Sequence, residues 1–456
     1  MEILIDMLTT LLLFILTLGI VITIHEFGHF YAAKYFAVKI LRFKVGFGTD
    51  LFAKKDKTGT IFSIGWIPLG GYVQMLDERS LESSDDVKNS FQSKSPIQRL
   101  IIVLAGPFAN ILLAIVVFWI FFLGGEQRIQ PIVGEPIKQS IAEEAGFQDG
   151  MRVLRIQDKS IESWTDINRS LFDLIGYSGN LKFSIESTAD LGNQEILIPV
   201  TSWLSEEEEP FPARDLGLIP QLNYDGVQII STESNGIAAA AGLMEGDKLI
   251  GVNGINTLSM ESFISEVKSN PNVPIIIDYE RKNIKESVEL IPEMVRKNDK
   301  EIGAIGVVLS PIISYPDYMN KTLRYNLLTA IPRALAETRQ SSVFVISSLR
   351  KLIMGDISPK NLSGPIGIAR VAGESARSGV FIFIRFVAIL SIMLGIMNLL
   401  PVPILDGGQA LFIMYEMIKG QPVPELVQSF SYRLGVFILL GLMFYATFND
   451  ISRFIR

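Results

Sequence analysis

Apolar residues gather in four long segments that are separated by stretches of mixed character. The segments cover residues 7–24, about 100–123, about 380–400 and about 434–448. About eighteen consecutive apolar residues suffice to cross the hydrocarbon core of a membrane as a helix, and only the fourth segment is shorter than that. The pattern therefore predicts a polytopic α-helical membrane protein with four transmembrane helices.

The first apolar segment could be a cleaved signal peptide or a retained transmembrane helix. The residues before it include Glu2 and Asp6 but no Lys or Arg. A signal peptide begins with a basic region and ends at a small-residue cleavage site, whereas the first small-residue pair here, Ala32 and Ala33, comes well after the segment. We therefore expect the segment to be retained as a transmembrane helix.

The distribution of Lys and Arg indicates how the chain is oriented. Ten of these residues lie between residues 39 and 99, and none precedes the first apolar segment. Cytoplasmic loops are enriched in Lys and Arg. The loop between the first two spans is therefore expected in the cytoplasm, and the N-terminus and the large segment between the second and third spans are expected on the outer side.

The large outer segment contains an internal repeat. Residues 141–156 (IAEEAGFQDGMRVLRI) and 237–252 (IAAAAGLMEGDKLIGV) align at an offset of 96 residues, with Gly146 matching Gly242 and Gly150 matching Gly246. Each copy continues into a turn and an amphipathic helix pattern. The pattern resembles a PDZ domain of the type found in bacterial proteases. The resemblance implies two tandem PDZ domains, which bind an extended peptide as an added strand.

The segment after the repeat, residues 315–358, has apolar residues at helical spacing with Arg and Lys between them. Such a pattern predicts amphipathic helices. These helices could pack on the two repeat domains, or they could lie on the membrane surface near the entrance of an active site. The sequence favours neither arrangement.

Composition agrees with a membrane protein that also carries domains in water. Hydrophobic residues make up 48% of the chain and the mean hydropathy is +0.35, yet 20% of the residues are charged. The net charge of −7 argues against nucleic acid as a partner. The chain has no cysteine, which excludes disulfides and thiolate metal ligands.

The only two histidines, His25 and His29, flank a glutamate in the motif His25-Glu26-Phe27-Gly28-His29 at the end of the first span. Residues at positions i and i+4 share one face of a helix, so both imidazoles can bind one zinc ion, and Glu26 is placed to act on a water there. Two core histidines are the alternative. Ionisable residues at membrane depth are costly and usually functional, which favours the metal site.

A catalytic zinc site usually has three protein ligands, and the chain has no third histidine. Asp406 follows the third span, in the sequence NLLPVPILDGG of residues 398–408. Pro401 and Pro403 break the helix there, and broken helices at membrane depth are tolerated only within protein or beside a water-filled cavity. A carboxylate is an accepted zinc donor, so Asp406 is the best candidate for the third ligand.

Three motifs together, HEFGH (25–29), AGPFAN (105–110) and NLLPVPILDGG, resemble the site-2 protease family of intramembrane zinc metalloproteases. The resemblance implies that His25, His29 and Asp406 bind one Zn²⁺ ion and that Glu26 is the general base. It also implies that residues 61–75 form a membrane-associated β-hairpin on the cytoplasmic side. The candidate substrate-binding residues are Asn398, Gly46, Gly48, Gly70, Gly71, Pro401 and Pro403.

The resemblance also implies the partners and the location. The substrates would be single-span membrane proteins already trimmed on the outer side, among them an anti-sigma factor of an envelope stress response and remnant signal peptides. The PDZ domains would exclude bulky outer domains or read a trimmed C-terminus. The protein would lie in the bacterial inner membrane, with the PDZ domains in the periplasm and the active site toward the cytoplasm.

Two other functions remain open. The chain could be a membrane-anchored PDZ adaptor or chaperone without catalysis, although the intact HEFGH motif and Asp406 speak against it. A zinc transporter fits poorly, because the chain has no His-rich loop.

The expected divisions are transmembrane helix 1 with its motif (1–36), hairpin loop (37–96), transmembrane helix 2 (97–124), PDZ domain 1 (125–222), PDZ domain 2 (223–311), amphipathic helices (312–378), transmembrane helix 3 (379–400), loop with Asp406 (401–430) and transmembrane helix 4 (431–456).

Overall fold

A computed structural model describes residues 2–77, 84–187, 192–205, 207, 210–233, 235–256, 259–297 and 300–455. Within these ranges, four helices are long and apolar enough to cross a membrane, as predicted: α1 (Glu2–Tyr35), α2 (Pro96–Leu123), α10 (Val380–Asn398) and α12 (Glu425–Ile455). α12 is longer than its apolar segment, because flanking polar residues continue the helix at both ends.

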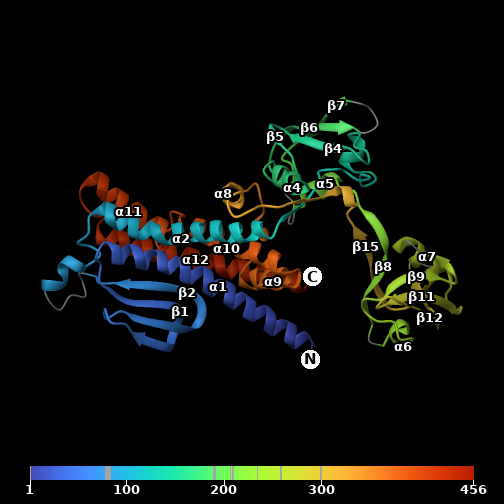
Figure 1. The fold of residues 1–456 in the computed structure, drawn as a ribbon, viewed down its shortest axis with the longest axis horizontal. Coiled ribbons are helices and arrows are strands. Elements are labelled where there is room, and N and C mark those ends of the chain that lie inside the picture. Colours follow the sequence, from blue (N-terminus) through green and yellow to red (C-terminus); the bar gives the residue numbers. More distant parts are fainter. Residues whose placement is uncertain are drawn as a thin grey trace.

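The four helices lie side by side in one bundle (Figure 1). α2 packs against α1 and α10, and also against α8 (Ala330–Met354) and α11 (Asp406–Lys419). Ser95 begins α2 with a capping box, and Pro96 occupies the first helical position, where its missing N–H is harmless. Both chain ends lie at the same end of the bundle.

A curled β-hairpin lies beside the other end of the bundle (Figure 1). It consists of β1 (Ile40–Lys55) and β2 (Ile61–Met75), followed by the short helix η2 (Ser84–Asn89). β2 folds back, so that residues 42–45 of β1 pair with residues 61–64 on one side and with residues 71–74 on the other, and Ile40 pairs with Met75. Residues 71–75 pair only with β1 among the described strands, which leaves them as an edge of the sheet.

Two small α+β units, residues 125–222 and 223–314, lie at the opposite end of the bundle from the hairpin (Figure 1). Each unit has its own hydrophobic core. The first has sheet order β5-β4-β6-β7 and the second β12-β11-β9-β8-β15, with β10 on β9. The elements of the first unit are β3 (Glu126–Ile129), α3 (Ile141–Glu144), β4 (Arg152–Ile156), β5 (Lys159–Ser160), α4 (Trp164–Phe172), β6 (Gly179–Ser187), β7 (Gly192–Val200) and α5 (Pro212–Leu216). Those of the second are β8 (Asn223–Thr232), α6 (Ile237–Ala240), β9 (Lys248–Val252), β10 (Ile255–Asn256), α7 (Met260–Ser269), β11 (Ile275–Arg281), β12 (Ile284–Leu290), β13 (Glu293–Lys297), β14 (Lys300–Ala304) and β15 (Val307–Ser314).

The repeat in the sequence corresponds to a repeat in the structure. In both units a one-turn helix is followed by a strand, a two-residue strand, a longer helix and a two-stranded hairpin. Gly146 and Gly242 have φ angles of 91° and 90°, and Gly150 and Gly246 have 86° and 88°. Glycine is favoured at these positions because other residues rarely adopt positive φ.

Two predicted segments differ from the structure. Residues 315–329 are not part of an amphipathic α-helix, because they contain η3 (Asp317–Met319) and the strand β16 (Asn320–Leu323), which pairs with β3. The helices of this region begin with α8 and continue with η4 (Pro359–Asn361) and α9 (Pro365–Arg377). Residues 401–430 were expected as a loop, but they contain the helix α11, because the two glycines after Asp406 allow a helix to begin close beside the preceding turn.

Candidate active site

The two histidines lie on one face of α1, as their spacing of four requires. Both side chains are largely buried, and their Nε2 atoms are 3.3 Å apart. The rings meet edge to face, with centroids 4.9 Å apart. Both imidazoles therefore point the same nitrogen toward one point beside α1.

Asp406 reaches the same point from the start of α11. Its Oδ2 lies 3.2 Å from His25 Nε2 and 3.5 Å from His29 Nε2. A carboxylate in the first turn of a helix is favoured by the helix dipole. The chain thus brings Asp406 to two histidines that lie more than 370 residues earlier in the sequence.

The turn between α10 and α11 holds Asp406 in place. α10 ends at Asn398, just before Pro401 and Pro403, which cannot continue a helix. A Cβ on Gly407 would lie 2.2 Å from Leu399 O, and one on Gly408 would lie 2.3 Å from Val402 O. Only glycine allows this close approach, so the Gly-Gly pair is what lets α11 begin directly behind the turn.

The geometry of the three ligand atoms fits a zinc ion. Tetrahedral zinc with nitrogen and oxygen ligands about 2.0 to 2.1 Å away places those ligands about 3.3 Å from one another. The three observed separations are 3.2, 3.3 and 3.5 Å. Asp406 Oδ2 is buried and has no hydrogen-bond partner among the described residues. A buried acceptor without a partner is costly, and a bound cation would remove that cost.

The three side chains line a cavity of about 590 Å³. Glu26 lines the same cavity and is only 8% exposed. The walls come from α1, α2, α10, α11 and α12, and from residues 70–73 and 75 at the edge strand of the hairpin. Among the candidate substrate-binding residues, Asn398, Gly70 and Gly71 line this cavity.

The other substrate-binding candidates do not line the cavity. Gly46 and Gly48 flank Phe47, which does, and both have positive φ angles of 85° and 83°. Their conformation serves the bend of β1, which turns Phe47 onto Gly70. Pro401 and Pro403 shape the turn before α11. These four residues therefore position their neighbours around the cavity.

The sequence motif AGPFAN contains residues that contact the site but were given no role. Gly106 packs directly on both imidazole rings, and the Asn110 side chain lies against His25. The carbonyl of Ile102 lies 2.9 Å from His29 Nδ1. An asparagine within an otherwise apolar membrane segment is a signal that could have revealed this contact, because an amide at membrane depth needs a partner.

Comparison with known proteins relates the chain to a family of peptidases. The model of peptidase family M50 matches residues 13–442. A protease RseP from Yersinia pestis is 37% identical over 98% of this chain and 99% of its own length. The regulator of sigma-E protease RseP from Escherichia coli K12 is 38% identical over 96% of this chain and 98% of its own. A PDZ domain of the SdrC-like protein from Listeria monocytogenes is 25% identical, covers 19% of this chain and 90% of that domain, and has a TM-score of 0.17.

The family match spans nearly the whole chain, and the relatives are similar along their full length. Proteins of this family are zinc metalloproteases. The resemblance drawn from the three sequence motifs is thereby confirmed. The chain belongs to peptidase family M50 and is an intramembrane metalloprotease of the site-2 type.

Proposed function

We propose that this protease hydrolyses a peptide bond within the transmembrane segment of single-span membrane proteins that have already been trimmed on the outer side. His25, His29 and Asp406 would hold the zinc ion, and Glu26 would be the general base. The observation that carries the proposal is the convergence of three ligand atoms in one cavity between membrane helices.

The chemistry follows from these groups. His25, His29 and Asp406 would hold the zinc ion, and when bound it would supply Lewis acidity at this point of the cavity. Glu26 takes a proton from the attacking water as the water oxygen bonds to the scissile carbonyl carbon, and it gives that proton to the amine nitrogen when the C–N bond breaks. Asn398 donates an amide hydrogen bond to the substrate backbone or to the oxygen that gains charge.

The hairpin edge supports a substrate in extended form. A transmembrane helix hides its peptide bonds in internal hydrogen bonds, so the substrate must unwind locally before cleavage. Residues 71–75 have one edge that is unpaired among the described strands, and all of them except Gln74 line the cavity that contains Glu26. An unwound segment can add to this edge as a further strand, which would present its peptide bond to the zinc site.

The proposed substrates and surroundings are more specific. The name of the Escherichia coli relative, regulator of sigma-E protease, supports an anti-sigma factor as the main substrate, with remnant signal peptides as a second class. We infer that both repeat units are PDZ domains on the periplasmic side of the inner membrane. They would act either as a size filter or as readers of a trimmed C-terminus. The zinc site would lie toward the cytoplasm.

The test compares wild type with Glu26→Gln in detergent, using a trimmed single-span protein as the substrate. We expect one zinc per chain in both proteins, and cleavage at least about 100-fold slower in the variant, because a general base contributes about that much or more. Zinc content is measured by metal analysis and cleavage by mass spectrometry of the products.

The same experiment separates the enzyme from a catalytically inactive adaptor. An adaptor would bind the trimmed substrate without cutting it, and wild type and Glu26→Gln would then behave alike. Equal cleavage by both proteins would instead remove Glu26 from the mechanism. Cleavage outside the transmembrane segment would contradict the proposed position of the scissile bond.

A further inference from the structure

One face of α2 supports both imidazoles. Ile102, Gly106 and Asn110 are spaced four residues apart, so they form a stripe along one side of the helix. All three are buried. A Cβ on Gly106 would lie 2.2 Å from His29 Nε2 and 2.9 Å from His25 Cε1, so the rings rest on the helix at this glycine.

The residues on either side of Gly106 contact the Nδ1 atoms. His29 Nδ1 lies 2.9 Å from Ile102 O, and His25 Nδ1 lies 3.3 Å from Asn110 Nδ2. A histidine that binds a metal through Nε2 carries its proton on Nδ1 and needs an acceptor there. The Ile102 carbonyl supplies that acceptor for His29. His25 also needs an acceptor at its Nδ1, and the Asn110 side chain is the group that lies there.

The amide of Asn110 can supply it. Asn110 is fully buried, and its Oδ1 has no hydrogen-bond partner among the described residues. A half-turn of the amide exchanges the oxygen and the nitrogen with almost no change in shape. This half-turn places Oδ1 toward His25 Nδ1, where it accepts the Nδ1–H hydrogen bond.

We propose that Asn110 is a positioning residue of the zinc site, whose amide oxygen accepts a hydrogen bond from His25 Nδ1–H and so keeps His25 Nε2 free for the metal. The inference rests on the proposed zinc ligands. Under this inference, α2 supports metal binding by positioning His25, although α2 itself contributes no ligand.

α10 lies against the backbone and Cβ of Asn110. Ser391 Oγ donates to Asn110 O at 2.8 Å. At Gly395 of α10, an added Cβ would lie 3.2 Å from Asn110 Cβ. The Ser391 contact involves the backbone of Asn110 and leaves its amide untouched, so Ser391→Ala is a matched control for changes at the amide.

The experiment measures zinc affinity by competition with a chromophoric chelator, for purified full-length protein in detergent. Asn110→Leu replaces the amide by an apolar group of similar size, and we expect it to bind zinc about 10- to 100-fold more weakly. Asn110→Asp keeps an acceptor at the same place and should bind zinc at least as tightly as wild type. Ser391→Ala should match wild type.

The outcomes are distinct. Equal zinc affinity in wild type and Asn110→Leu would overturn the inference, and so would equally weak binding in Asn110→Leu and Asn110→Asp, because that pattern indicates a packing role only. If Asn110→Leu does not fold, Asn110→Ala removes the acceptor without added bulk and is subject to the same comparison. Wild type that binds no zinc would instead refute the proposed ligand set.

Discussion

At the scale of single residues, Gly106 packs so closely on the site that an added Cβ would lie 2.2 Å from His29 Nε2. Alanine favours a helix over glycine by about 1 kcal/mol, so the backbone of α2 would accept Gly106→Ala. We nevertheless expect this variant to bind zinc at least about 10-fold more weakly, because the methyl group occupies the position of an imidazole. Chelator competition measures the change.

Gly19→Ala is the control for this prediction. Gly19 also lies within an apolar helix, α1, but a Cβ there would meet nothing within 4 Å. Gly19→Ala should keep both zinc and activity. Wild-type zinc affinity in Gly106→Ala would show that the imidazoles do not rest against α2 when the metal is bound.

The residues of the site differ in how visible they are in the sequence. His25, Glu26 and His29 are close together and share a helix, so their spacing alone suggests a zinc site. Asp406 follows from the lack of another histidine. The contact between Asn110 and His25 joins residues 85 positions apart, and it depends on how α1 packs against α2. The lone asparagine of the second apolar segment indicates that its amide needs a partner, but no local pattern identifies His25 as that partner.

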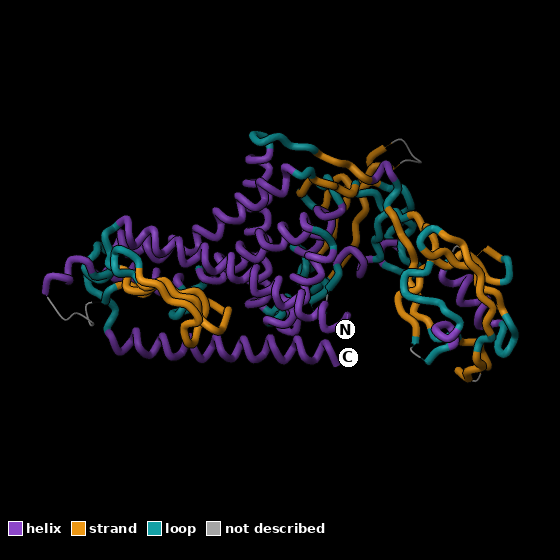
Figure 2. Tube along the Cα trace, turned by 60° about the horizontal axis from the view of Figure 1, so that its bottom comes forward, coloured by secondary structure: helices purple, strands orange, loops and turns teal. Residues whose placement is uncertain are grey.

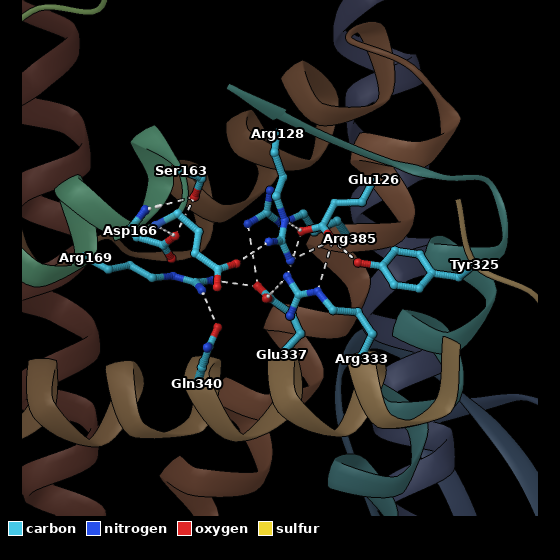
Figure 3. A network of polar contacts seen from close by, with 11 residues as sticks. Glu126, Arg128, Ser163, Asp166, Arg169, Tyr325, Arg333, Glu337, Gln340 and Arg385 are labelled. Atoms are coloured by element: carbon cyan, nitrogen blue, oxygen red, sulfur yellow. Dashed lines mark hydrogen bonds and ion pairs between the residues drawn. The ribbon is translucent and has the colours of Figure 1, made fainter. Parts of the chain in front are cut away.

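At the scale of elements, a buried ion network joins the first α+β unit to the membrane bundle through α8 (Figure 3). Glu337 on α8 is 4% exposed. Its carboxylate lies 2.6 Å from Arg169 of α4, 3.0 Å from Arg333 and 3.7 Å from Arg385 of α10. One carboxylate therefore bridges the first unit, α8 and the third membrane helix.

We predict that Glu337→Gln loosens this junction. Three arginines would lose a shared counter-charge, and removing one partner of a buried ion pair costs about 3 kcal/mol or more. Hydrogen exchange should become faster in α4 and α8. Glu374→Gln is the control, because Glu374 and Arg370 form an exposed pair of the kind worth at most about 1 kcal/mol. Unchanged exchange in Glu337→Gln would show that apolar packing alone holds the junction.

A second carboxylate of the same network stays charged throughout the pH range of such experiments. Burial disfavours the ionised form of Glu126, but hydrogen bonds from Arg333 and Arg128 outweigh that effect and lower its pKa from 4.5 to about 2. A carboxylate with a lowered pKa stabilises the fold above its ordinary pKa, and this stabilisation is lost as the pH falls through the lowered value. Glu126 therefore remains ionised at neutral pH in wild type.

The elements that were predicted well are those with a local signal. The four apolar helices follow from length and hydropathy, and the repeated glycines marked turns that do adopt positive φ. The strand β16 was missed because its partner, β3, lies almost 200 residues earlier in the chain. α11 was missed because Gly407 and Gly408 suggest a loop, whereas they are needed for close packing against the turn before the helix.

At the scale of the whole molecule, the chain is divided between the two ends of the helix bundle. The hairpin and α11 lie toward one end, and the two α+β units and both chain ends lie toward the other (Figure 2). If the four apolar helices cross the membrane, the hairpin and the α+β units are on opposite sides of it. The positive-inside rule selects the orientation, because the basic residues concentrate in the loop that contains the hairpin.

The absence of cysteine makes this orientation directly testable, because a single introduced thiol is unique. Lys57 is exposed at the tip of the hairpin, and Lys268 is exposed on α7 of the second α+β unit. In intact spheroplasts, we expect a membrane-impermeant thiol reagent to label Lys268→Cys and not Lys57→Cys. Both should be labelled after the membrane is opened. Labelling of Lys57→Cys alone would show that the topology is inverted, with the zinc site toward the outer face. Labelling of both variants in intact spheroplasts would show that the bundle does not separate the two sides.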